Sequence, residues 1–258
     1  MVKPQAPRKA RSTPAASAGE RLPVRAVARA FELLAQLGGD APSRTLSGLA
    51  RATKLPVSTV ARLLATLEQA DFVRRDNEGR YAPGTRLLRA GLAALRGNDI
   101  YDLSEPHLRR LSQASGETAN LVTRADPENA IYLRQVLSER SLHHAGWLGR
   151  LLPIAATAAG QALLGQGERD GYVAMRDALE EGVTAVAAPV RGPEGRVVAS
   201  LSITGPSFRI RDAQLARFGA LLVAEAAQLS EALGAPALAS GAGAGATRGT
   251  QRKTAAKR

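Results

Sequence analysis

The chain lacks cysteine entirely and has only three histidines among its 258 residues. It therefore cannot form disulfides, thiolate metal sites or a cysteine nucleophile, and this composition fits a reducing compartment. Two of the histidines, His143 and His144, are adjacent and only His107 lies elsewhere, so we expect no histidine-based metal site. No stretch approaches the ~18 apolar residues that suggest a membrane span. The basic first residues are also not followed by the apolar core of a signal peptide. We expect a cytoplasmic protein that contacts no membrane.

Motifs of catalysis are lacking as well. The sequence contains no G-x-S-x-G elbow, no P-loop and no metal-ligand spacing. The alternating glycines of residues 241–245 lie in a terminal tail rather than after a strand. We therefore predict no enzyme activity and no cofactor.

Acidic residues are too few to balance the basic ones, and the net charge is +12. The excess is uneven: residues 1–19 carry +4, residues 20–96 carry +6, residues 97–236 carry −3 and residues 237–258 carry +5. This distribution favours a front half and tails that meet a polyanion such as double-stranded DNA. The ordinary alternative is that an arginine-rich composition only keeps the protein soluble.

The first half of the chain predicts three helices. The first is indicated by apolar residues at helical spacing and ends at Gly38-Gly39; these residues are Val24, Val27, Phe31 and Leu34. Thr45 can cap a short second helix that ends near Lys54, and Pro56 fits the first position of a third. The third helix has one apolar stripe, formed by Val60, Leu63, Leu64 and Leu67.

Two short β segments follow, at residues 72–75 and 80–82, and the turn residues 76–79 join them into a wing. A narrow apolar seam then predicts a linker helix that can pair with a copy of itself, with Leu88, Gly91, Leu92 and Leu95 in the seam and Arg86, Arg89 and Arg96 beside it.

From about residue 98 the pattern is that of a mixed α/β domain. Helices are predicted at residues 102–115, 158–164 and 212–233, and strands at residues 121–124, 131–137, 184–190 and 196–203. The last two strands form a hairpin. Beyond Pro236 we expect a flexible tail of low complexity.

Several stretches resemble the IclR family of bacterial regulators. They are Ala30-Phe31-Glu32-Leu33-Leu34 and residues 49–67, 72–75, 81–88, 152–164 and 187–190, in the family's order and spacing. The resemblance implies an α+β protein with a winged helix-turn-helix, a GAF-like effector-binding domain, and a homodimer or homotetramer on promoter DNA. We expect a basic arm at 1–19, the DNA-binding domain at 20–84, the linker at 85–97, the effector domain at 98–235 and a basic tail at 236–258.

Two departures from the family concern the effector domain. Only six residues separate Leu164 from Gly171, where the family usually has a helical insert. The segment from Gly171 to Gly182, with Met175-Arg176-Asp177 in its middle, differs from the acidic pattern of members that sense small organic acids, and Ala185 stands where those members can place a cysteine. The resemblance therefore implies a shortened sensor whose effector cannot be carried over.

The candidate DNA-binding residues lie opposite the leucine stripe of the third helix and in the wing; they are Ser58, Thr59, Arg62, Thr66, Arg74, Arg75 and Arg80. The third helix of such a unit enters the major groove, where an arginine such as Arg62 can bind guanine through two hydrogen bonds. Ser58 and Thr59 suit phosphates or base edges, and the wing arginines suit the DNA backbone. The simpler reading of these polar residues is a solvated helix face.

The candidate effector-binding residues surround the start of the helix at 158–164. Thr157 can cap that helix, while the N–H groups of Ala158 and Ala159 and the cation of Arg176 suit an anionic ligand. Weaker candidates, for which core packing is the simpler explanation, are Trp147, Ala185, Ser200 and Ser202. We predict a transcriptional regulator, associated with the nucleoid, that controls a metabolic operon in response to a small carboxylate. The alternative is a DNA-binding protein whose C-terminal domain only oligomerises.

Overall fold

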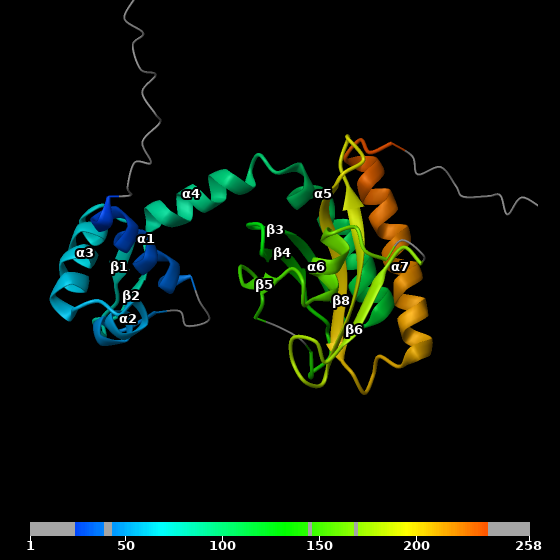
Figure 1. Ribbon diagram of the computed structural model, residues 1–258, viewed down its shortest axis with the longest axis horizontal. Coiled ribbons are helices and arrows are strands. Elements are labelled where there is room, and N and C mark those ends of the chain that lie inside the picture. Colours follow the sequence, from blue (N-terminus) through cyan, green and yellow to red (C-terminus); the bar gives the residue numbers. More distant parts are fainter. Residues whose placement is uncertain (1–23, 39–42, 144–145, 168–169, 237–258) are drawn as a thin grey trace, which may run out of the picture. The chain divides into compact units, whose positions relative to one another are not determined.

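The computed structural model describes residues 24–38, 43–143, 146–167 and 170–236 (Figure 1). The predicted arm and almost all of the predicted tail lie outside these residues, as does His144. The chain divides between Ala93 and Ala94 into two compact units, each of which is described by itself. In the part of the chain that the structure describes, no helix is long and apolar enough to cross a membrane.

The first unit contains three helices followed by a two-stranded hairpin and a fourth helix. The elements are α1 (Arg25–Leu37), α2 (Leu46–Thr53), α3 (Val57–Gln69), β1 (Val73–Arg75), β2 (Tyr81–Pro83) and α4 (Thr85–Leu95). The hydroxyl of Thr45 accepts the N–H of Gly48 at 3.1 Å and so caps α2 as predicted. Lys54 ends α2 in the left-handed conformation, with φ of 54°. Pro56 precedes α3 as its N-cap rather than as its first residue.

The buried face of α1 lies away from the side that carries Val27 and Phe31. Val24, Val27 and Phe31 are exposed, while Leu33 and Leu37 are buried against residues of α2, α3 and the hairpin. Leu33 and Leu37 lie one helical turn apart on a side of α1 that points away from Phe31. The prediction of a helix is confirmed, and Leu34, one of the four apolar residues that indicated it, packs partly buried against this core.

The second unit is built on one six-stranded sheet with the order β5-β4-β3-β8-β7-β6, in which every neighbouring pair is antiparallel. The elements are α5 (Asp99–Ser115), β3 (Thr118–Arg124), β4 (Asn129–Val136), β5 (Leu151–Pro153), α6 (Ala158–Leu163), β6 (Val173–Arg176), β7 (Val183–Arg191), β8 (Val197–Pro206) and α7 (Asp212–Ala232). The two edge strands β5 and β6 are absent from the prediction, and α5 starts three residues earlier than expected, at Asp99.

The sheet separates two apolar cores. Alternate side chains of a strand point to opposite faces, and in β8 Leu201 and Ile203 point into the core shared with α5 and α7. The core on the opposite face contains α6 together with Trp147 and Tyr132. Figure 1 shows α7, in orange, running beside this sheet. Because α6 is short, it covers only part of its face and leaves room for a recess beside it.

Candidate functional site

The surface of α3 has the polarity expected of a helix that contacts DNA. Val60 and Leu64 are buried beneath it, while Ser58, Arg62 and Thr66 are exposed and Thr59 is half-buried. The Thr66 hydroxyl donates to the carbonyl of Arg62 at 3.1 Å, so its proton is held by the helix backbone. Within the described residues, no acidic side chain forms an ion pair with Arg62. The guanidinium of Arg62 is therefore available to a base or a phosphate.

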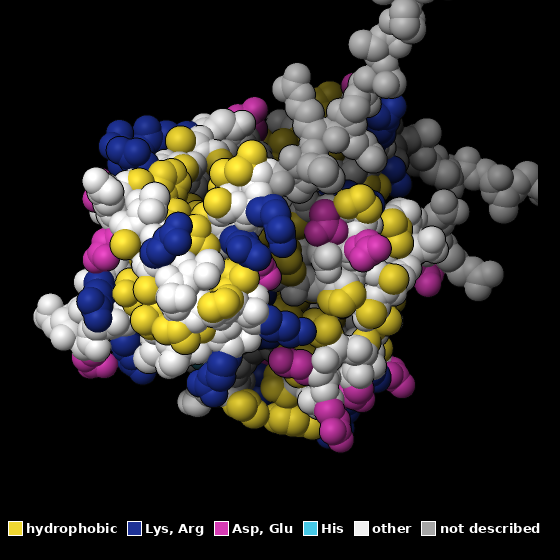
Figure 2. Space-filling model, turned by 60° about the vertical axis from the view of Figure 1, so that its left-hand side comes forward, with side chains coloured by type: hydrophobic (Ala, Val, Ile, Leu, Met, Phe, Trp, Pro, Cys, Tyr) yellow, Lys and Arg dark blue, Asp and Glu magenta, His cyan; other side chains and the backbone are white. Residues whose placement is uncertain are grey.

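A shallow groove runs along the contact of α1 with α3. Its walls include Arg29 and Ala30 of α1 and Thr59, Arg62 and Thr66 of α3. Figure 2 shows that Lys and Arg side chains are spread among hydrophobic ones over the face drawn there. The sequence analysis missed Arg29 because it treated α1 only as a packing helix.

The wing is closed by its own side chains. Arg75 donates to the carbonyl of Gly79 at 3.2 Å, and its guanidinium lies 5.6 Å from the centre of the Tyr81 ring. The Asp76 carboxylate accepts the N–H groups of Arg80 and Glu78, and chiefly the first of these lowers the pKa of Asp76. Arg80 lies in the turn rather than in the second strand, 3.5 Å from Glu78. Arg75 and Arg80 thus have partners within the wing, whereas Arg74 is exposed on the other face of β1.

The second unit contains a recess beside α6 with about 440 Å³ of space outside protein atoms. Its walls are the aromatic rings of Tyr132 and Trp147, the start of α6, strands β6 and β7, and the loop from Ala178 to Glu180. Ser202 and Thr204 of β8 form its floor. This figure includes space open to solvent, and the centre of a water molecule can occupy only about 30 Å³ of it, so the walls have to move apart to admit a small-molecule ligand.

Most of the predicted effector residues line this recess, but two do not. Those that line it are Trp147, Thr157, Ala158, Ala159, Ala185 and Ser202. Ser200 is fully buried beneath α6 and donates its hydroxyl to the carbonyl of Ala159 at 3.0 Å. Arg176 donates to the carbonyl of Ile210 at 2.6 Å and to Asp212 at 2.8 Å, at the start of α7. Because Met175 faces the recess, the next residue of β6 has to face the other way. The expectation that Arg176 neutralises a ligand is therefore corrected.

The sequence analysis missed several lining residues, including Tyr132, Met175, Glu180 and Thr204. Only Thr204 had a signal in the sequence, because it continues the alternation of Ser200 and Ser202 along one strand face. Tyr132 of β4 lies far along the chain from Met175 of β6 and from Glu180 in the loop after it, and the three meet only in the folded domain.

The electrostatics of the recess depend on one carboxylate. Glu180 is the only charged side chain among the described residues of the lining. Burial, and after it the charge of Glu180, raises the pKa of the Tyr132 phenol to about 12. Tyr132 is therefore neutral at physiological pH, and its ring packs edge-on against Trp147 with 5.5 Å between ring centres.

The hydroxyl groups around the recess differ in whether their protons are already donated within the protein. Thr157 caps α6 by accepting the N–H of Gly160 at 3.1 Å, and it donates to the carbonyl of Pro153 at 2.9 Å. Its hydrogen-bonding capacity is thus used within the protein. Ser202 and Thr204 accept hydrogen bonds from the side chain of Asn120 and, within the described residues, donate none.

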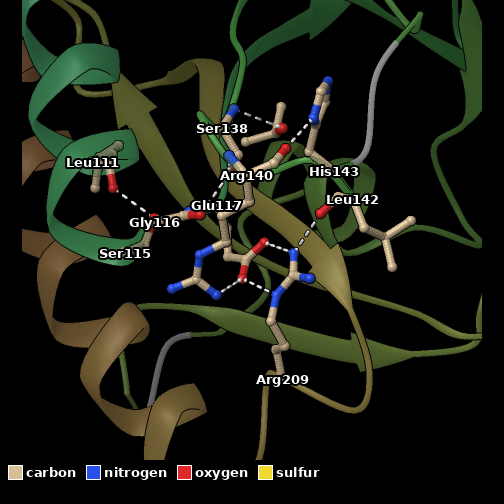
Figure 3. Close-up of polar contacts among 10 residues, drawn as sticks. Leu111, Ser115, Gly116, Glu117, Ser138, Arg140, Leu142, His143 and Arg209 are labelled. Carbon is tan, nitrogen blue, oxygen red and sulfur yellow. Dashed lines mark hydrogen bonds and ion pairs between the residues drawn. The ribbon is translucent and has the colours of Figure 1, made fainter.

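A buried ion cluster anchors the loop that precedes Trp147 (Figure 3). Glu117 is only 2% exposed and accepts two hydrogen bonds from Arg209, both at 2.8 Å, and one from Arg140 at 3.2 Å. Arg209 also donates to the carbonyl of Leu142 at 2.8 Å. A side chain at Gly205 would lie 2.5 Å from the Glu117 carboxylate, so the glycine leaves space for this cluster. The cluster fixes one end of the segment that carries Trp147 to the recess.

No group of histidine and acidic side chains that could hold a metal ion occurs among the described residues. A metal would therefore have no recognisable site in this part of the chain.

Both units match known protein families. The model of the IclR helix-turn-helix domain matches residues 26–77. The model of the C-terminal domain of the bacterial transcriptional regulator IclR matches residues 92–170 and 164–231. The two segments of the C-terminal match overlap at residues 164–170, in the connection between α6 and β6 where the sequence analysis expects a shortened segment.

Curated relatives and solved structures agree with these matches. The HTH-type transcriptional repressor AllR of Escherichia coli K12 is 28% identical over 245 residues, which cover 81% of this chain and 90% of the relative. XynR, a transcriptional regulator of the same strain, is 29% identical over 250 residues, with 83% and 99% covered. An IclR regulator from Alicyclobacillus acidocaldarius has a TM-score of 0.70 at 25% identity, with 81% and 99% covered. An IclR homologue from Microbacterium hydrocarbonoxydans in complex with 4-hydroxybenzoate has a TM-score of 0.68 at 22% identity, with 81% and 98% covered.

Proposed function

Because this chain belongs to the IclR family of bacterial transcriptional regulators, we propose that it controls a metabolic operon in response to a small carboxylate bound in the recess beside α6. The chain is a DNA-binding regulator and not an enzyme, as its sequence predicted. The observation that supports a ligand is the recess itself, in which two aromatic rings face two buried hydroxyl groups.

The chemistry of the recess favours a ligand with two different ends. The hydroxyls of Ser202 and Thr204 suit an acceptor such as a carboxylate oxygen, and the rings of Tyr132 and Trp147 suit an apolar or aromatic body. The 4-hydroxybenzoate bound to the homologue from Microbacterium hydrocarbonoxydans combines these features.

A thermal-shift screen of hydroxy acids and aromatic acids, followed by DNA binding with and without each hit, tests this proposal. A ligand that acts on DNA binding must prefer one state of the protein, and such coupling is typically worth about 1–3 kcal/mol. We expect at least one acid to raise the melting temperature and to change operator affinity by about fivefold or more. Acids that bind without any change in DNA affinity, or no hit at all, would support a C-terminal domain that only oligomerises.

On DNA, we propose that α3 reads bases through Arg62, with Ser58 and Thr59 near the helix start and Arg74 on the backbone. The exposure of Arg62 and its freedom from acidic partners among the described residues support this role. Arg62→Ala should cost about 1–3 kcal/mol at the operator and less on unrelated DNA. Electrophoretic-shift titrations with operator and scrambled DNA measure both affinities, and Arg196→Ala, at an exposed position between β7 and β8 of the second unit, serves as a charge-matched control. An unchanged operator affinity would remove Arg62 from base recognition.

We also propose that α4, within the linker at 85–97, pairs with its copy in a homodimer or a dimer of dimers. This helix has no buried residue, and Leu88 and Leu92 are 61% and 45% exposed. Exposed leucines one turn apart on a helix are typical of a pairing seam. Leu88→Glu together with Leu92→Glu should shift the sedimentation coefficient toward a smaller species, and an unchanged coefficient would contradict the pairing.

A further inference from the structure

Asn120 occupies a position from which it can control the floor of the recess. It lies in β3 opposite Ser202 of β8 in the sheet register and is completely buried. Its neighbours Ala119 and Leu121 belong to the core on the α5 and α7 side, so the Asn120 side chain points to the face of the sheet that carries α6. An uncharged amide fully buried in a strand needs hydrogen-bond partners for both of its ends.

Those partners give the amide a defined direction. Gln135 of β4 donates from Nε2 to Asn120 Oδ1 at 2.8 Å. With its oxygen engaged in this way, Asn120 turns its NH2 group toward β8, where Nδ2 donates to Thr204 Oγ1 at 3.2 Å and to Ser202 Oγ at 3.4 Å. Hydrogen bonding therefore runs in one direction, from Gln135 through Asn120 to the two hydroxyls.

The hydroxyl oxygens of Ser202 and Thr204 accept these hydrogen bonds from Asn120. Their own protons therefore point away from Asn120. Ser202 and Thr204 are 1% and 3% exposed, and both line the recess. No acceptor for either proton occurs among the described residues, whereas the neighbouring hydroxyl of Ser200 donates to the carbonyl of Ala159. A buried donor without an acceptor costs free energy until a partner arrives.

We infer that Asn120 and Gln135 are positioning residues that make Ser202 and Thr204 hydrogen-bond donors toward the recess, so that this floor selects a ligand with an acceptor atom. This inference rests on the proposed function, because it assigns the direction of hydrogen bonding in the same recess. It predicts that a carboxylate or carbonyl oxygen docks on β8 and that an amine or amidinium group is disfavoured there.

The substitution Gln135→Glu should reverse the direction of these hydrogen bonds without altering any residue that lines the recess. A glutamate carboxylate only accepts hydrogen bonds, so Asn120 has to turn its NH2 group toward it and its Oδ1 toward β8. The protons of Ser202 and Thr204 then bond to Asn120 and no longer reach the ligand. The change in side-chain volume is minimal.

The direction of the Asn120 amide can be measured without any ligand. Selective labelling of the full-length protein with ¹⁵N-asparagine gives only four side-chain amides, those of Asn77, Asn98, Asn120 and Asn129. In the wild type, the NH2 protons of Asn120 should show nuclear Overhauser contacts to the side chains of Ser202 and Thr204. In Gln135→Glu those contacts should move to residue 135. Contacts to Gln135 that are stronger than those to Ser202 and Thr204 in the wild type would overturn the inference, whatever the protein binds.

The consequence for ligand selection is measured by calorimetric titration with benzoate and benzamidine, which share a ring but present an acceptor and a donor respectively. We expect Gln135→Glu to weaken benzoate binding about tenfold, the usual effect of losing hydrogen bonds to a charged group, and not to weaken benzamidine binding. Loss of folding is checked by the melting temperature of each variant.

The added negative charge at residue 135 can itself repel benzoate, and a double-mutant cycle separates the two effects. In a background of Ser202→Ala with Thr204→Val, the two donors are already absent, so Gln135→Glu should cause little further loss. An equal loss in both backgrounds would overturn the inference, because charge repulsion alone would then account for it. A wild type that binds neither probe but shows the expected Overhauser contacts would contradict the carboxylate ligand of the proposed function while leaving the direction of the hydrogen bonds intact.

Discussion

The two faces of the six-stranded sheet differ sharply in chemistry although they are made by the same strands. Toward α5 and α7, residues such as Leu201 and Ile203 are fully buried in an aliphatic core. Toward α6, the intervening Ser202 and Thr204 are just as deeply buried but carry hydroxyl groups and border a recess. Both faces bury apolar side chains, and the face toward α6 gives up part of that burial in β8 for hydroxyl groups that a ligand can use.

This contrast implies that adjacent residues of β8 should respond oppositely in measurements of stability and of ligand binding. The comparison can be tested at single residues because the strand alternates strictly between the two faces from Ala199 to Thr204.

The largest effect on stability is expected for Leu201→Ala. The side chain is fully buried among α5, α7 and the neighbouring strands, so its truncation loses apolar burial and leaves a cavity. Such substitutions cost about 2–5 kcal/mol in the free energy of unfolding. Urea denaturation followed by circular dichroism measures the loss. The fraction that remains folded should keep the ligand affinity of the wild type, and a stability within about 0.5 kcal/mol of the wild type would refute the division of roles between the faces.

A smaller, pH-dependent effect is expected where α5 meets α7. Glu225 accepts hydrogen bonds from Arg110 at 2.7 Å and pairs with His107 at 2.7 Å. Burial tends to raise the pKa of Glu225, but the hydrogen bonds from Arg110 and His107 outweigh it and hold the pKa below its usual value of 4.5. Since the folded state has the lower pKa, the stabilising contribution is complete above about pH 4.5 and is lost as the pH falls through the folded-state pKa.

Glu225→Gln should therefore lower the free energy of unfolding by about 1–2 kcal/mol at pH 7 and by less at pH 3. Urea titrations at both pH values give the difference. The control Glu231→Gln, on the same helix, should show no such pH dependence. A constant difference between Glu225→Gln and the wild type across this range would mean that the carboxylate charge does not stabilise the contact of α5 with α7.

Local chemistry decided which parts of the fold the sequence could predict. The cap at Thr45, the turn at Lys54 and the apolar stripe of α3 are determined by residues within one or two helical turns, and the structure agrees with each prediction. The face on which α1 packs depends on partners that are distant in the sequence, and the apolar spacing that indicated this helix did not identify Leu33 and Leu37 as its buried residues. Edge strands of three or four residues, β5 and β6, are too short to give a period.

The recess was harder to predict because its lining comes from seven separate segments, namely strands β4, β6, β7 and β8, helix α6 with its cap, and the loops that carry Trp147 and Glu180. The start of α6 was identified from Thr157, whose side chain acts locally as a cap. Arg176 was assigned to the wrong side because its sequence neighbours do not reveal the phase of β6. Asn120 and Gln135 could not be identified from the sequence, because only the pairing of β3 with β4 and β8 brings them beside each other and beside Ser202.

The smallest effect on stability is expected for Ser202→Ala, directly beside Leu201. Asn120 keeps its hydrogen bond to Thr204 at 3.2 Å, and the substitution also removes a buried hydroxyl proton that has no acceptor among the described residues. The free energy of unfolding should therefore stay within about 0.5 kcal/mol of the wild type. Binding of the acids identified by thermal shift should nevertheless weaken about tenfold, because one donor on the floor of the recess is lost.

Ser200→Ala, two residues away on the same face, is the matched control for this prediction. Its hydroxyl bonds to the carbonyl of Ala159 and does not line the recess, so its loss leaves a buried carbonyl without that partner. We expect about 1 kcal/mol lower stability and little direct change in ligand affinity. We therefore expect opposite effects of the two substitutions. Ser202→Ala should weaken ligand binding with little change in stability, and Ser200→Ala should lower stability with little change in ligand binding. Equal effects of the two substitutions on binding would show that the recess is not the ligand site, since a hydroxyl beneath α6 would then matter as much as one on its floor.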